Sequence, residues 1–302
     1  MIHGILNVYK EKGYTSHDVV AKLRKITGQK KIGHTGTLDP DATGVLPVCL
    51  GKATKLCDLL TDKDKTYEAV LLLGRNTDTQ DISGEVISEK DTSALTESAV
   101  REAVLSFVGE YDQIPPMYSA LKVNGKKLYE LAREGKVVER KSRKVMIKRI
   151  QILAVELPRV RMSVSCSKGT YIRTLCNDIG EKLGCGGCME SLVRTCVGRF
   201  RIEESMTLDV IEQRMKQEIL GDYIVPVDEM FFDCPKVFVA EKGETGARNG
   251  GILPEDTVCR EKDLPDGQKV RLYDVREHFI ALYQWKERSG EYHLIKMFFP
   301  EI

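Results

Sequence analysis

Near the start of the chain, apolar residues recur at helical spacing, at Val19, Val20, Leu23 and Ile26. Ser16 stands in an N-cap position and Gly28 ends the run, so the sequence predicts a helix between these two residues. Similar patterns predict four more helices, at residues 53–60, 100–108, 127–133 and 171–183.

Elsewhere apolar and polar residues alternate, which indicates strands. In Lys65–Leu73, the side chains of Tyr67, Ala69 and Leu71 fall on one face. Residues 118–123 resemble a strand ending at the turn Asn124-Gly125, and residues 145–156 and 160–167 resemble an antiparallel pair. These elements predict an α+β body with much antiparallel strand.

The composition changes after about residue 230. From Pro235 onward, short apolar runs alternate with turns, which predicts a small all-β barrel. The sequence therefore predicts two domains, residues 1–230 and residues 231–302.

The chain has 302 residues, 42% apolar and 30% charged, which is typical of globular proteins. No stretch approaches the roughly 18 consecutive apolar residues of a membrane span, and the first residues are not a signal peptide. We therefore expect a cytoplasmic protein whose nine cysteines are reduced. Cys185 and Cys188 form one pair, but a zinc ribbon needs a second, so no metal is expected.

Positive charge is concentrated in one segment, although the net charge is only +1. Residues 122–149 contain eleven Lys or Arg and three Glu. Such a run is compatible with a solvated face and equally with a surface that docks a phosphate backbone.

The stretch GHTGTLDPDATGVLP, residues 33–47, is too rich in Gly and Pro for a helix or a strand interior. It is either an ordinary surface turn or a rigid loop that holds one acid in place. The flanking sequence lacks the glycine and hydroxyl residues of a phosphate-binding loop, and a glycine fingerprint for dinucleotides is missing from the chain. An aspartic protease would need a second such loop, which is also missing.

With these kinds of site excluded, the reactive group that the loop offers is a single carboxylate. Asp39 precedes Pro40 and lies between Gly36 and Gly44, residues that favour a tight loop and close approach of a ligand. With an ordinary pKa near 4 it would be ionised at neutral pH and could act as a nucleophile. Asp41 is the competing candidate.

Five stretches of the chain resemble the TruB family, the bacterial synthases that make pseudouridine at position 55 of tRNA. They are residues 13–25, 33–55, 65–86, 115–135 and 168–187, in family order and at similar spacing. The resemblance spans roughly residues 2–230. One departure is Lys10-Glu11, where the family often has Lys-Pro.

The resemblance implies a pseudouridine synthase fold, with a mixed, largely antiparallel central sheet flanked by helices. The tail is similar in size and strand pattern to a small PUA-like RNA-binding domain. The implied reaction breaks the uracil N1–C1′ bond, turns the base and joins C5 to C1′, so no cofactor is expected. Whether the nucleophile attacks C6 of the base or C1′ of the sugar is left open.

The resemblance also implies roles for individual residues. Asp39 matches the nucleophile, Tyr67 the active-site tyrosine that stacks on the uracil, and Arg173 the arginine that pairs with the nucleophile. The implied substrate-binding residues are His34, Tyr171, Leu192, Lys10 and Lys12.

The implied partner is tRNA, bound through its T-arm with the target uridine flipped out. Lys122, Lys126, Lys127 and Arg133 are expected to face that arm. We expect a monomer that needs no guide RNA and contacts no membrane. Two alternatives are an RNA-binding protein or RNA chaperone without chemistry, and a synthase of the same fold aimed at another RNA, as in relatives that use guide RNAs.

Overall fold

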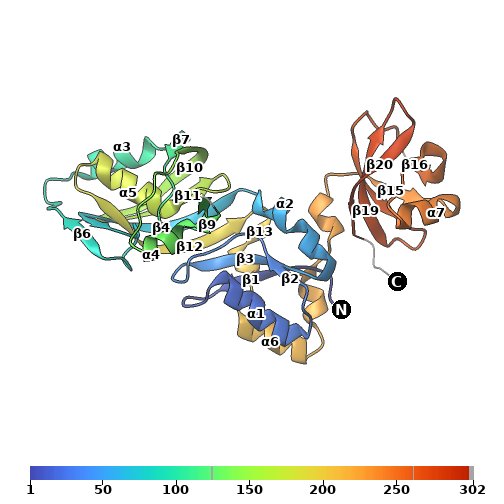
Figure 1. Cartoon of the computed structure of the whole chain (residues 1–302), viewed down its shortest axis with the longest axis horizontal. Helices are drawn as coiled ribbons and strands as arrows, with labels where there is room; N and C mark the ends of the chain where they lie inside the picture. The colour runs from blue at the N-terminus through green and yellow to red at the C-terminus, as the bar shows by residue number, and fades with distance from the viewer. Residues whose placement is uncertain (124, 261, 299–302) are drawn as a thin grey trace.

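The largest sheet in this computed structural model, which describes residues 1–123, 125–260 and 262–298, forms the body of the molecule (Figure 1). Its main strands, in spatial order, are β14 (Ile224–Val225), β1 (Gly4–Lys10), β3 (Thr43–Leu50), β12 (Gly187–Val197), β4 (Lys65–Leu73), β11 (Arg159–Cys166), β10 (Arg143–Glu156) and β7 (Gly109–Gln113). β2 (Ile32–His34) pairs with β3, and β13 (Phe200–Arg201) pairs with β12. Because β12 and β3 run parallel and the other pairs antiparallel, the predicted mixed, largely antiparallel sheet is confirmed.

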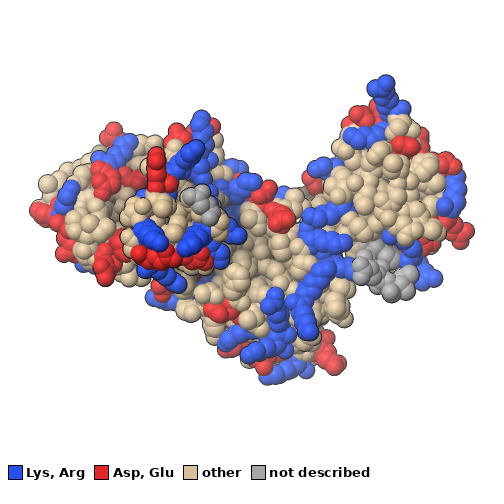
Figure 2. Space-filling view, viewed as in Figure 1, with Lys and Arg blue, Asp and Glu red and all other residues tan. Residues whose placement is uncertain are grey.

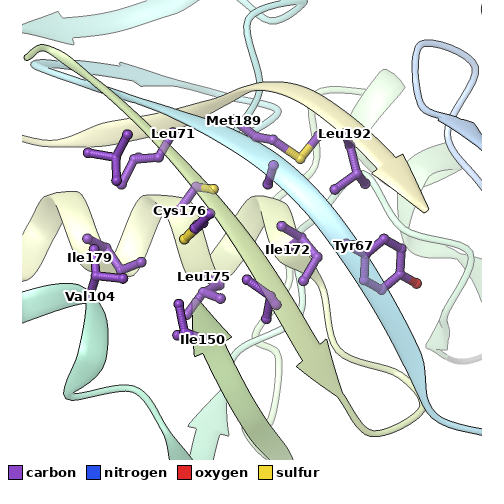
Figure 3. Packing of buried hydrophobic residues seen from close by; sticks show 14 of the residues in the cluster. Tyr67, Leu71, Val104, Ile150, Ile172, Leu175, Cys176, Ile179, Met189 and Leu192 are labelled. Atoms are coloured by element: carbon purple, nitrogen blue, oxygen red, sulfur yellow. The ribbon is translucent and has the colours of Figure 1, made fainter. Parts of the chain in front are cut away.

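Helices cover this sheet in two groups. α1 (Ser16–Thr27) and α6 (Leu208–Lys216) pack against β1 and β3, with Val19, Leu23 and Ile211 fully buried between them. α3 (Glu97–Leu105) and α5 (Ile172–Lys182) pack near β4, β11 and β12, where α5 contributes Ile172, Cys176 and Ile179 to a second core (Figure 3). The shorter elements are η1 (Gly51–Leu56), α2 (Cys57–Thr61), β5 (Arg75–Thr77), β6 (Val86–Glu89), β8 (Lys122–Val123), β9 (Lys126–Lys127), α4 (Leu128–Arg133), η2 (Ile202–Glu204), η3 (Leu220–Tyr223) and η4 (Asp228–Phe231).

The first helix begins as predicted, but its N-cap is Thr15 and not Ser16. The Thr15 hydroxyl accepts a hydrogen bond from the Asp18 backbone N–H, and the Asp18 carboxylate accepts one from the Thr15 N–H. This reciprocal capping box satisfies two donors that the helix leaves open. The Ser16 side chain is therefore free to contact another part of the chain.

Among the remaining elements, the predicted strand at residues 118–123 is wrong. Only Lys122 and Val123 are in a strand, because the backbone of residues 118–120 bends. Asn124 lies outside the described residues. The antiparallel pair of β10 and β11 and the strand β4 are confirmed, and the predicted helix at residues 53–60 is divided into the 3-10 helix η1 and α2.

The tail forms a separate six-stranded sheet. Its strands, in spatial order, are β16 (Leu253–Pro254), β20 (Glu291–Met297), β19 (Phe279–Lys286), β18 (Lys269–Tyr273), β15 (Lys236–Val239) and β17 (Val258–Cys259). The unit is barrel-like, but it also contains the α-helix α7 (Glu241–Arg248) and the 3-10 helix η5 (Glu255–Thr257), which the all-β prediction missed. Two glycines obscure the helical pattern of α7, and Gly243 packs so closely that an added Cβ would lie 2.8 Å from the Val239 side chain.

The tail contacts the body through an apolar cluster. Phe231, Phe279 and Phe298 pack with body residues that include Ile5 and Leu56. The Lys55 ammonium donates a hydrogen bond to the Met297 carbonyl at 2.8 Å. The division at residue 230 stays a prediction. Within the described ranges, no helix is long and apolar enough to cross a membrane.

Candidate active site

Within the Gly- and Pro-rich stretch, residues 35–42 form a tight loop between β2 and β3. The prediction that the stretch is unsuited to a strand is wrong at its two ends, since residues 33–34 lie in β2 and residues 43–47 in β3. Gly44 fits in β3 because the Arg194 backbone approaches it closely. The Ala42 N–H donates to the Asp39 carbonyl at 3.1 Å, which closes a turn with Pro40 at its second position. Leu38 and Ala42 are buried in the same core cluster as Tyr67 and anchor the loop on either side of Asp39. The side chain of Asp39 remains 42% exposed, so a ligand can reach it.

The start of α1 and the turn before it hold this loop in place. The Ser16 hydroxyl accepts a hydrogen bond from the Leu38 N–H at 3.0 Å. The Pro40 carbonyl accepts hydrogen bonds from the Gly13 N–H at 2.9 Å and from the Lys10 ammonium at 3.0 Å. The loop is therefore a rigid support rather than an ordinary surface turn.

Lys10 does not have the position expected of an RNA contact. The residue is fully buried, and its ammonium also donates to the Tyr14 and Glu11 carbonyls at 2.6 and 3.1 Å. With its three donors occupied, it has none to offer a phosphate. Burial lowers the pKa of Lys10 to about 8. Lys10 therefore supports the backbone of the loop at Pro40.

Arg173, from the first turn of α5, pairs with Asp39 as expected from the sequence. Its Nε lies 3.0 Å from Asp39 Oδ2, and its side chain is only 7% exposed. The same guanidinium donates to the Thr79 carbonyl at 3.0 Å and to the Tyr118 carbonyl at 2.8 Å. These contacts fix the guanidinium, so it can orient the carboxylate.

Asp81 is a second carboxylate at this site, which the sequence pattern did not reveal. Its Oδ2 lies 3.5 Å from Arg173 Nη1, and its Oδ1 accepts hydrogen bonds from Thr79 and Ser83. Gln80, just before it, has a φ of 64°, a conformation that is costly outside glycine. Nothing in the periodicity of residues 78–84 signals this arrangement, because it is a compact turn held by side chains.

Opposing effects act on the ionisation of Asp39. Burial raises the pKa of the Asp39 carboxyl, the Arg173 guanidinium opposes that rise, and the nearby Asp81 carboxylate adds to it. The pKa of Asp39 is therefore above the ordinary value assumed from the sequence. A partly desolvated carboxylate oriented by a guanidinium is suited to nucleophilic attack.

Tyr67 and Leu192 lie on neighbouring strands at the edge of the core. The Tyr67 ring closes one end of the apolar cluster, and its hydroxyl points away from the labelled core residues (Figure 3). Burial raises the pKa of Tyr67, which keeps its phenol protonated as a hydrogen-bond donor. Leu192 is buried on β12, opposite Ala69 of β4, and completes an apolar wall.

His34 and Tyr171 lie at the ends of elements that border the loop. The His34 ring packs edge-to-face on His17 at 5.2 Å, and its Nδ1 accepts a hydrogen bond from Gly36 N–H at 3.4 Å. Burial lowers the pKa of His34, which favours the neutral ring. Tyr171 is the N-cap residue of α5, and the buried Gln113 bonds both its N–H and its carbonyl.

Most of the remaining charged candidates are exposed. Lys12 lies 3.9 Å from Asp41, and both side chains are mostly in solvent, so Asp41 lacks the fixed setting of Asp39. Of the four basic residues expected to face RNA, Lys127 is partly buried. The other three are exposed, namely Lys122, Lys126 and Arg133.

A buried arginine on β12, Arg194, is another residue that sequence reasoning missed. Its guanidinium contacts the backbone of the loop that carries Asp39. Cys185 and Cys188 are both buried, and within the described part of the chain no group of His, Cys, Asp and Glu is arranged to hold a metal ion.

Comparison with known proteins gives concordant results. Residues 24–172 match the family described as TruB family pseudouridylate synthase (N terminal domain), and residues 173–231 match the tRNA pseudouridylate synthase B C-terminal domain. The chain is 56% identical to the tRNA pseudouridine synthase B of Lachnoclostridium phytofermentans, covering 98% of this chain and all of that protein. The corresponding protein of Clostridium kluyveri is 44% identical, with 98% and 99% covered.

Solved structures of related architecture include a Cbf5-Nop10-Gar1 complex, at 28% identity and a TM-score of 0.72, covering 99% of this chain and 85% of that one. An H/ACA RNP bound to a substrate RNA containing 2′-deoxyuridine matches at 25% identity and the same TM-score, covering 99% and 86%. The extent of these matches, together with the loop that carries Asp39, shows that the chain belongs to the TruB family of pseudouridylate synthases.

Proposed function

We propose that this chain isomerises the uridine at position 55 of tRNA to pseudouridine, with Asp39 as the nucleophile. The observation that carries the proposal is the 3.0 Å pairing of Asp39 with the buried Arg173 on a rigid loop. Pure RNA binding would not require a half-exposed carboxylate held against a buried guanidinium. The names of the relatives support tRNA as the substrate.

In this proposal, the Asp39 carboxylate attacks a uracil nucleotide that has left the RNA stack. The N1–C1′ bond breaks, the base turns, C5 bonds to C1′, and the bond that Asp39 formed to the nucleotide breaks, which restores the free carboxylate. The proton on C5 then leaves and N1 gains one, so atoms and electrons balance without a cofactor. Arg173 orients the carboxylate, Tyr67 stacks on the base and assists proton transfer, and Leu192 helps exclude water.

The T-arm of tRNA is the part that we propose contacts the body. His34 and Tyr171 border the loop, where flipped nucleotides would lie. The exposed residues Lys122, Lys126 and Arg133 would bind the backbone of the arm, and residues 231–302 would form a second RNA-binding unit. We further propose that the enzyme acts as a monomer in the cytoplasm.

The test is to incubate the protein with an unmodified tRNA transcript and to map pseudouridine. We expect it at the T-loop uridine with the wild-type chain and at no position with the Asp39→Asn variant. Tight binding without pseudouridine in any tRNA would favour the RNA-binding protein instead. Since one structural neighbour is an H/ACA RNP bound to a substrate RNA, a parallel reaction with guide RNA tests the stand-alone activity.

A further inference from the structure

Arg194 combines almost complete burial with a charge that no carboxylate of the described residues neutralises. It has the largest side chain among the fully buried residues, at 1% exposure. Within residues 1–123, 125–260 and 262–298, no acidic group forms an ion pair with its guanidinium, and burial lowers its pKa. Because a buried charge is costly, its contacts must compensate for its desolvation.

These contacts join the two ends of the loop that carries Asp39, residues 35–42. Arg194 Nε donates to the Val45 carbonyl at 2.7 Å, where the chain leaves the loop. Its two terminal nitrogens lie 3.5 Å from the Thr37 carbonyl and 3.3 Å from the Gly36 carbonyl, where the chain enters it. A planar fork with five N–H donors in a fixed geometry can bridge both ends at once.

The backbone of Arg194 restrains the same loop. Arg194 pairs with Gly44 in the short parallel ladder between β12 and β3. The contact is so close that a Cβ on Gly44 would lie 2.2 Å from the Arg194 carbonyl oxygen. Across the other edge of β12, Arg194 is the register partner of Tyr67, with which its side chain also interacts.

We propose that Arg194 is a positioning residue for the isomerisation, which holds the loop so that Asp39 is aligned with both Tyr67 and Arg173. The inference rests on the proposed function. A displacement of a reacting group by about 1 Å can reduce a rate by roughly 100-fold. Loss of this bridge should therefore slow chemistry without weakening RNA binding, because Arg194 is buried away from solvent.

The chain contains a matched control for this experiment. Arg271 in β18 is also buried, and it donates to the Cys234 and Phe232 carbonyls at 2.9 and 3.5 Å, far along the chain from the loop. Arg194→Met and Arg271→Met thus remove the same kind of contact. Thermal unfolding and tRNA affinity are measured for both, followed by the single-turnover rate at saturating enzyme.

We expect the single-turnover rate to fall about 100-fold in Arg194→Met, with tRNA affinity retained, while Arg271→Met keeps the wild-type rate. Arg194→Lys keeps the charge and most of the volume, guarding against a folding failure, and should also be slow because the fork is lost. Combined with Tyr67→Phe, Arg194→Met should show non-additive losses and Arg271→Met additive ones.

The outcomes separate the two proposals. If the wild-type chain forms no pseudouridine, the proposed function fails and the inference fails with it. If the wild type is active but Arg194→Met keeps its rate, only the inference fails. The inference also fails if Arg194→Met loses rate merely in step with tRNA affinity or to the same extent as Arg271→Met.

Discussion

The Arg173 guanidinium contacts two carboxylates that differ in their access to solvent. Asp39 is 42% exposed at its side chain, whereas Asp81 is 17% exposed and accepts hydrogen bonds from Thr79 and Ser83. The more accessible carboxylate is the one available to a substrate. The enclosed one helps to hold the arginine and influences the charge at the site.

This arrangement predicts opposite pH shifts for two substitutions. We expect the acid limb of the rate profile to report ionisation of Asp39, whose pKa is raised by burial, lowered by Arg173 and raised further by Asp81. In Arg173→Gln the limb should move to higher pH, and in Asp81→Asn to lower pH, while both variants turn over at least about tenfold more slowly because the geometry loosens. Single-turnover rates across the acid range provide the measurement. Shifts in the same direction for both variants would contradict the assignment.

At the scale of elements, two adjacent residues at the start of α1 have different roles: one caps the helix and the other holds the loop that carries Asp39. The Thr15 hydroxyl caps the helix, whereas the Ser16 hydroxyl accepts the Leu38 N–H beside the nucleophile. Both residues look alike to a sequence pattern, because either can cap a helix. Their different neighbours assign them different tasks.

Substitution of these two residues separates the tasks. Thr15→Ala should lower the free energy of unfolding by about 1 kcal/mol and leave the rate unchanged. Ser16→Ala leaves the Leu38 N–H without its partner, which costs about 1–3 kcal/mol, and should also slow turnover. Urea denaturation and single-turnover rates measure both effects. Equal rates for the two variants would remove Ser16 from the support of the loop.

The ladder between β3 and β12 depends on glycine at one position. Gly44 has a φ of 106° and no room for a Cβ beside the Arg194 carbonyl, whereas Gly28 at the end of α1 has a φ of 64° and open space. Gly28→Ala should cost about 1–2 kcal/mol from its backbone conformation alone. Gly44→Ala should cost more, because the strands must also separate. Urea midpoints at constant m-value give the comparison, and equal costs would contradict it.

At the scale of the whole molecule, charge is unevenly distributed. On the face in Figure 2, Lys and Arg gather along the middle of the body and toward the tail, while Asp and Glu predominate at the end that carries β6. A small net charge therefore conceals a surface suited to a polyanion.

Binding of tRNA should accordingly weaken as salt rises. Neutralising Lys122 or Arg133, both exposed, should reduce the slope of log affinity against log salt by roughly 0.7–0.9 for each phosphate that the variant no longer binds. Arg101→Ala is the control, since this exposed residue on α3 is ion-paired with Glu97. Filter binding over a salt series measures the slopes, and an affinity insensitive to salt would exclude an electrostatic interface.

The sequence by itself determined the elements whose apolar residues recur at a regular short spacing. The spacing of apolar residues predicted α1, β4, and the pair β10 and β11, because side-chain periodicity reflects the face that an element buries. The residues of the loop and their resemblance to one family also indicated Asp39 and its partner Arg173.

Only the tertiary structure decided which polar groups meet. Arg173 is 134 residues from Asp39, and Arg194 is 158 residues from the Gly36 carbonyl. Strand pairing brings such residues together, and no local pattern encodes that pairing. The same holds for Lys10, which the sequence pattern cannot distinguish from a surface lysine. Its ammonium is buried, and three backbone carbonyls accept its hydrogen bonds there. Local elements and candidate reactive residues can thus be predicted from the sequence, whereas the burial and contacts of a side chain depend on how distant parts of the chain pack.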